Sequence, residues 1–67
     1  MSYIVEFTSG DKSERILETT DRAAAIATAE QEQIKRGEAG QKGIISLYEV
    51  TTERGQPMRK CYDFWEV

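Results

Sequence analysis

The chain has material for one long helix, Thr20 to Arg36, between two stretches that are typical of β-hairpins. A single helix covers one face of a small sheet and leaves the other face open. The strand segments nevertheless carry apolar residues on both alternation phases. Because large apolar groups on an open face usually mark a contact surface, the pattern directs attention to binding.

Four segments have the β-branched and aromatic content of strands. Glycine, aspartate and serine at 9–12 separate the first two, and a loop of about five residues at 53–57 separates the last two. We therefore predict an α+β domain spanning residues 1–67, with a four-stranded antiparallel sheet and one helix on one face, in the order β-β-α-β-β. The predicted strands are Tyr3–Thr8, Glu14–Thr19, Ile44–Thr52 and Met58–Val67.

The helix has signals at both ends. Thr20 is the expected N-cap, and the alanine-rich run Ala23–Ala29 has high helix propensity. Lys35 and Arg36 suit the negative end of the helix dipole, and Gly37 is expected to close the helix in a left-handed conformation.

The helix face expected to pack on the sheet is narrow and made mostly of small residues. At about 100° per residue, Ala23, Ile26, Ala27 and Ile34 share one stripe. Glu30 falls in the middle of this stripe, where its carboxylate needs either an overhang beyond the sheet edge or a cation. We expect the overhang.

Residues two apart in a strand share a face, so the apolar groups of each strand divide between the two sides. A sheet with one solvated face would show polar residues on that side throughout. On this reasoning the opposed sets are Tyr3, Val5 and Phe7 against Ile4; Ile45 and Leu47 against Ile44, Tyr48 and Val50; and Tyr62 and Phe64 against Cys61 and Trp65.

Aromatic side chains dominate the energetics of protein interfaces. We expect Trp65 or Tyr48 on the uncovered face, with Arg59 and Lys60 beside them as charged groups at a rim. The predicted protein-binding residues are Tyr48, Trp65, Tyr62, Arg59 and Lys60. The expected partner is a second copy of the chain in a homodimer, or another protein.

Composition weighs against several other functions. The chain is 67 residues long, carries a net charge of −3 and contains no histidine, which removes the commonest proton shuttle and a frequent metal ligand. Cys61 is the one cysteine, so we expect no intrachain disulfide, no metal site and no cofactor. A small enzyme or enzyme subunit stays as an alternative, to be distinguished by a Glu30 with a raised pKa beside a pocket.

A second alternative is a nucleic-acid-binding module. Lys35, Arg36 and Lys42 form the one local basic cluster, next to a glycine-rich connection, Gly37–Gly43. Within it, Gly40-Gln41-Lys42-Gly43 has the spacing of the GxxG loop of KH domains, although that loop joins two helices and here a strand follows.

The order of parts also resembles small proteins carried by phages and mobile elements, some anti-CRISPR inhibitors among them. The resemblance lies in a Tyr3-Ile4-Val5 strand, a Ser13-Glu14-Arg15 segment, the alanine-rich helix from Thr20 and a final hairpin. It implies a stoichiometric inhibitor of a host nucleoprotein complex and assigns no individual residue. The start of the chain has neither a charged n-region nor a long apolar run, so a cytoplasmic location without membrane contact is expected.

Overall fold

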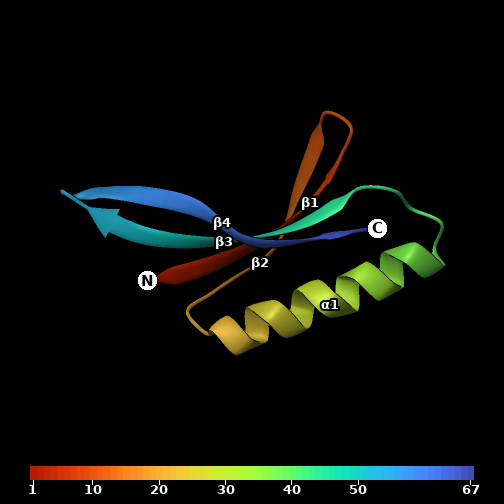
Figure 1. Cartoon of the computed structure of the whole chain (residues 1–67), viewed down its shortest axis with the longest axis horizontal. Helices are drawn as coiled ribbons and strands as arrows, with labels where there is room; N and C mark the ends of the chain where they lie inside the picture. The colour runs from red at the N-terminus through yellow and green to blue at the C-terminus, as the bar shows by residue number, and fades with distance from the viewer.

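The computed structural model describes residues 1–67 and confirms the predicted α+β architecture in the order β-β-α-β-β (Figure 1). All four strands are antiparallel to their neighbours and form one open sheet in the order β2-β1-β3-β4. The elements are β1 (Ser2–Ser9), β2 (Lys12–Thr19), α1 (Arg22–Glu38), β3 (Ile44–Glu53) and β4 (Gln56–Glu66).

Both hairpins close with tight turns. Gly10 adopts a φ of 63° in the first, as a turn at this position requires. In the second, Arg54 and Gly55 have φ values of 53° and 78°, a pair of left-handed residues that suits a two-residue hairpin turn. The expected five-residue loop is therefore wrong, because β3 and β4 stay paired up to Glu53 and Gln56.

The helix begins and ends later than the sequence predicts. Asp21, not Thr20, is the N-cap, and its carboxylate accepts a hydrogen bond of 3.2 Å from the Ala24 amide. The helix continues through Gly37 to Glu38, and the left-handed residue is Gly40, with a φ of 77°. Aspartate competes well with threonine at an N-cap, which explains the shift at the first end.

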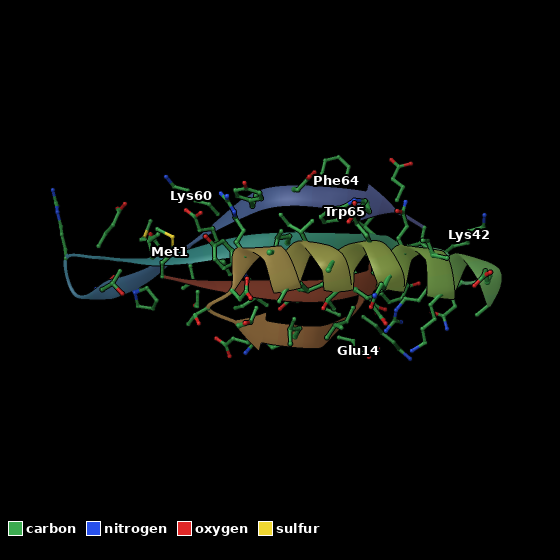
Figure 2. The ribbon with its side chains drawn as sticks, turned by 90° about the horizontal axis from the view of Figure 1, so that it is seen from below. Met1, Glu14, Lys42, Lys60, Phe64 and Trp65 are labelled. Carbon is green, nitrogen blue, oxygen red and sulfur yellow. The ribbon has the colours of Figure 1, made fainter.

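The helix lies along β1 and β3, on one side of the sheet (Figure 2). Ala25 and Ala29 are fully buried there, whereas Ala23 and Ala27 are exposed. The predicted stripe is therefore wrong, because the helix is rotated about its axis relative to the prediction. The rotation also leaves Ile34 63% exposed and Glu30 in solvent. The two buried alanines lie four apart and let the helix approach the sheet closely.

The core lies between the helix and the two central strands. Val5, Ile45 and Leu47 are its largest fully buried side chains. Partly buried residues from β2, α1 and the C-terminal end extend it. The full cluster is Tyr3, Val5, Phe7, Ala25, Ala29, Ile45 and Leu47, with Ile16, Leu17, Ile26, Trp65 and Val67 against it.

Each outer strand carries one β-bulge. Val5 pairs with Leu17 and Glu6 with Arg15, so Ile16 is the extra residue in β2. In β4 the extra residue is Tyr62, because Leu47 pairs with Asp63 and Tyr48 with Cys61. A bulge shifts the alternation of side chains by one residue, so each outer strand changes phase part-way along.

Candidate protein-binding surface

The side of the sheet away from the helix is covered by no other element of the chain; we call it the open face. Ile4 and Glu6 of β1 point to this side, opposite Val5 and Phe7, and directly paired residues of an antiparallel sheet share a face. The paired residues of β3 and β4 extend this face across the sheet. The central residues of the open face are Ile4, Glu6, Ile44, Ser46, Tyr48, Val50, Arg59, Cys61 and Phe64.

Two large apolar side chains at one end of the open face are in contact with solvent. Ile44 is 42% exposed and Phe64 is 57% exposed. Phe64 is paired with Ser46, which lies two residues along β3 from Ile44, so the two apolar groups are diagonal neighbours on adjacent strands. Ser46 itself is buried. This part of the surface is small, apolar and rigidly placed on two strands.

The middle of the open face is organised around Arg59. Its guanidinium lies 3.9 Å from the centre of the Tyr48 ring, and its Nη2 donates a 2.6 Å hydrogen bond to Glu6 Oε1. The Glu6 side chain is only 14% exposed, so this ion pair is partly shielded from water. Stacking and pairing together hold three side chains from β1, β3 and β4 in one arrangement.

The five predicted binding residues divide between the two sides of the sheet. Tyr48 and Arg59 lie on the open face as expected and contact one another. Lys60 pairs with Glu49, whose phase in β3 is the helix-side one, so it points away from the open face. Trp65 pairs with the fully buried Ile45 and packs on the core, so the structure does not place it on the open face.

Tyr62 is also on the helix side. Its ring meets that of the core residue Tyr3 edge-on, with centroids 6.5 Å apart and an interplanar angle of 86°. Its hydroxyl accepts a 3.3 Å hydrogen bond from Arg22 Nη1 in the first turn of α1. Tyr62 is therefore a bridge between sheet and helix, although 46% of it remains exposed.

The bulge at Tyr62 explains these corrections. Strict alternation groups Tyr62 with Phe64 and Cys61 with Trp65, whereas the extra residue puts Cys61 with Phe64 and Tyr62 with Trp65. Ile44, Phe64 and Glu6 lie outside the predicted set of binding residues. The phase of β3 places Ile44 correctly from the sequence, but no local pattern announces the bulge that brings Phe64 beside it.

The residues of the nucleic-acid alternative come together at the C-terminal end of α1, but they are differently engaged. Arg36 stacks over Phe7 at 4.3 Å and bonds to Glu32 at 2.9 Å, so its side chain is only 14% exposed. Lys35 is exposed and lies 3.7 Å from the same Glu32. Lys42 is exposed on the loop after the helix. Arg36 is thus held by Glu32 and Phe7, with its Nη2 turned to the exposed Glu14, and of the three basic residues Lys42 alone forms no ion pair.

The remaining reactive groups lie apart from one another. Glu30 is exposed and does not line the one pocket of the fold, which lies at the C-terminal end of α1. Cys61 is an exposed free thiol on the open face, with Sγ 3.7 Å from the Asp63 carbonyl oxygen. No three Cys, Asp or Glu side chains gather in a metal-binding geometry. The helix lacks the length and apolar character needed to cross a membrane.

Comparisons of the chain with protein-family models, curated proteins and solved structures gave no match.

Proposed function

We propose that this protein is a non-catalytic binding protein that contacts another protein chain, a second copy or a different protein, through the open face. The observation that carries the proposal is the pair of exposed apolar side chains, Ile44 and Phe64, on adjacent strands of a face that no element of the chain covers. Rigid apolar groups of this kind supply the buried centre of an interface.

The surroundings of this pair support the same reading. The Arg59–Glu6 ion pair and the Tyr48 ring adjoin the apolar end and provide the polar margin that interfaces usually have. One specific form of the proposal is a stoichiometric inhibitor of a nucleoprotein complex, which the resemblance in plan implies.

The experiment compares three forms of the full chain: wild type, Ile44→Asp with Phe64→Asp, and Ile34→Asp. Ile34 is a matched control because it is an isoleucine, 63% exposed, on the outer side of the helix. Light scattering over a concentration series measures self-association, and affinity capture with mass spectrometry measures other partners. Circular dichroism checks that each variant is folded.

The proposal predicts association or capture that the open-face variant loses and Ile34→Asp keeps. A wild-type chain that stays monomeric at all concentrations, and captures the same proteins as the open-face variant, contradicts it. Equal losses in the two variants also contradict it, because the effect would then belong to surface apolarity in general.

A further inference from the structure

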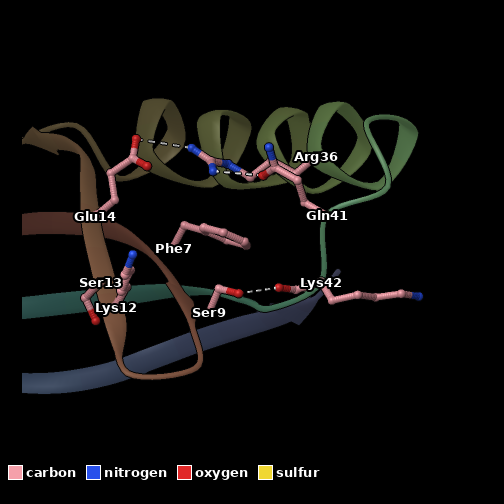
Figure 3. A pocket seen from close by; sticks show the side chains of 8 residues that line it. All are labelled: Phe7, Ser9, Lys12, Ser13, Glu14, Arg36, Gln41 and Lys42. Atoms are coloured by element: carbon pink, nitrogen blue, oxygen red, sulfur yellow. Dashed lines mark hydrogen bonds and ion pairs between the residues drawn. The ribbon is translucent and has the colours of Figure 1, made fainter.

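A pocket lies on the helix side of the sheet, at the C-terminal end of α1 (Figure 3). Its volume is about 560 Å³, within the range of small-molecule sites. The walls come from the β1–β2 hairpin, the last turns of the helix and the loop that follows it. Its lining residues are Phe7, Ser9, Lys12, Ser13, Glu14, Arg36, Gln41 and Lys42.

The loop wall is fastened to the rest of the fold. The Ser9 hydroxyl donates a 2.8 Å hydrogen bond to the Lys42 backbone carbonyl. The backbone N–H of Gln41 donates one of 2.9 Å to the Arg36 backbone carbonyl. Gly43 lies so close to Phe7 that an added Cβ would come within 2.7 Å of the ring. The glycine-rich connection is thus held in place, so the pocket is formed before any ligand arrives.

Arg36 connects several of the residues that line the pocket. Its guanidinium covers the Phe7 ring and bonds to Glu32 at 2.9 Å. It also bonds to Gln41 at 3.2 Å and to Glu14 at 3.3 Å (Figure 3). Glu14 is 63% exposed, so its pairing with Arg36 is weakly held. An anion entering the pocket can therefore replace the Glu14 carboxylate on Arg36 Nη2.

The charged side chains of the pocket that form no ion pair are both positive, although the chain carries a net charge of −3. Lys12 and Lys42 are exposed and neither forms an ion pair. They stand on opposite rims, Lys12 at the β1–β2 turn and Lys42 on the loop, where its side chain extends outward (Figure 3). Exposed lysines change rotamer within nanoseconds, so Lys42 can fold back over a bound group.

We propose that this pocket binds a small phosphate-bearing molecule, with Lys12, Lys42 and Arg36 Nη2 meeting the phosphate. Seven of the eight lining residues are polar, which favours a polar ligand over a lipophilic one. The Gln41 side-chain amide offers a hydrogen bond to the rest of the ligand. The small size of the pocket and its two free lysines favour a compact phosphate over an extended nucleic-acid backbone, which needs a longer basic track.

The test titrates the full chain with pyrophosphate at low salt and follows backbone amides by ¹H–¹⁵N NMR. The proposal predicts saturable shifts confined to residues 7–14 and 36–43 and an affinity that falls as sodium chloride is added. Lys12→Gln with Lys42→Gln weakens binding by at least about tenfold, because two charge-assisted contacts are lost. Lys60→Gln leaves the affinity unchanged and serves as the matched control, since Lys60 also has no ion pair but lies on β4.

A second titration uses a single-stranded oligonucleotide with the same phosphate concentration. Absence of shifts with pyrophosphate up to millimolar concentration overturns the proposal, and so does an equal loss in Lys60→Gln. Binding of the oligonucleotide without binding of pyrophosphate also overturns it, in favour of a nucleic-acid surface. None of these outcomes bears on the open face, which lies on the other side of the sheet.

Discussion

Two adjacent isoleucines on opposite faces of β3 give the sharpest test of the sheet assignment. Ile45 is fully buried beneath the helix, whereas Ile44 is 42% exposed on the open face. Each is replaced by alanine, so the removed atoms are the same and only the surroundings differ. The structure therefore predicts very different losses of stability from two chemically identical changes.

The magnitudes follow from burial. Removing the Ile45 side chain from a packed core costs about 2–5 kcal/mol, since the transfer and cavity contributions both apply. Removing the Ile44 side chain costs about 1 kcal/mol or less, because much of it already contacts water and no enclosed cavity is left. A domain of this size has a total unfolding free energy of roughly 3–10 kcal/mol, so Ile45→Ala approaches the limit of folding.

Urea unfolding followed by Trp65 fluorescence measures both losses, because Trp65 is the one tryptophan and packs on the core. With a slope of about 1 kcal/mol per molar urea, the two midpoints should differ by at least about 1 M. Ile45→Val, expected to cost about 1 kcal/mol, provides a folded intermediate if Ile45→Ala is too unstable. Losses within about 0.5 kcal/mol of each other for the two alanine variants would refute the assignment of faces.

Three further changes test separate parts of the fold. Asp21→Ala removes the helix N-cap and should lower the unfolding free energy by about 1 kcal/mol, whereas Thr20→Ala should change it little. Equal losses of stability for the two variants in urea unfolding would mean that Asp21 is not the cap. Gly43→Ala forces a Cβ against Phe7 and the Thr8 carbonyl and should cost about 1–3 kcal/mol of stability. Gly37→Ala places its Cβ in open space and should be neutral or stabilising. A lower melting temperature for Gly37→Ala than for Gly43→Ala would contradict the packing of the loop. Cys61 should react with a thiol reagent in the folded protein at nearly its rate in urea, and strong protection in a monomer would show that the open face is covered.

The sequence predicts the order of elements well because the signals involved are local. Glycine turns, β-branched runs and the alanine-rich segment each specify one element, and the alternation in β3 correctly separates Ile44 and Tyr48 from Ile45 and Leu47. These signals are also redundant, since several residues support each element.

The rotation of the helix is harder to predict because alanine gives it little contrast. Five of the seven residues from Ala23 to Ala29 are alanine, so several stripes are almost equally apolar, and shape decides among them. The fold presents Ala25 and Ala29 to the sheet and lets Ile34 remain exposed. The same rotation places the Arg36 guanidinium over the Phe7 ring. The spacing of residues along the helix does not predict this long-range contact.

The candidate surface depends on one further event that the sequence does not signal, the bulge at Tyr62. It separates Trp65, which packs on the core, from Cys61 on the open face, and it brings Phe64 to the same face as Cys61. The partnership of Glu6 with Arg59, 53 residues apart, likewise arises from the strand order β1-β3-β4 rather than from either hairpin. The pocket has the same origin, because its residues come from three separate segments.

The most direct test of the open face as a binding surface is methyl NMR of the isoleucine-labelled chain in the associated and dissociated states. Ile44 on the open face and Ile34 on the outer helix surface are both exposed and report on opposite sides of the molecule. The account predicts that the Ile44 methyl signals shift or broaden on association with a second copy or a captured protein, while those of Ile34 do not. Changes at Ile34 with an unaffected Ile44 would contradict it.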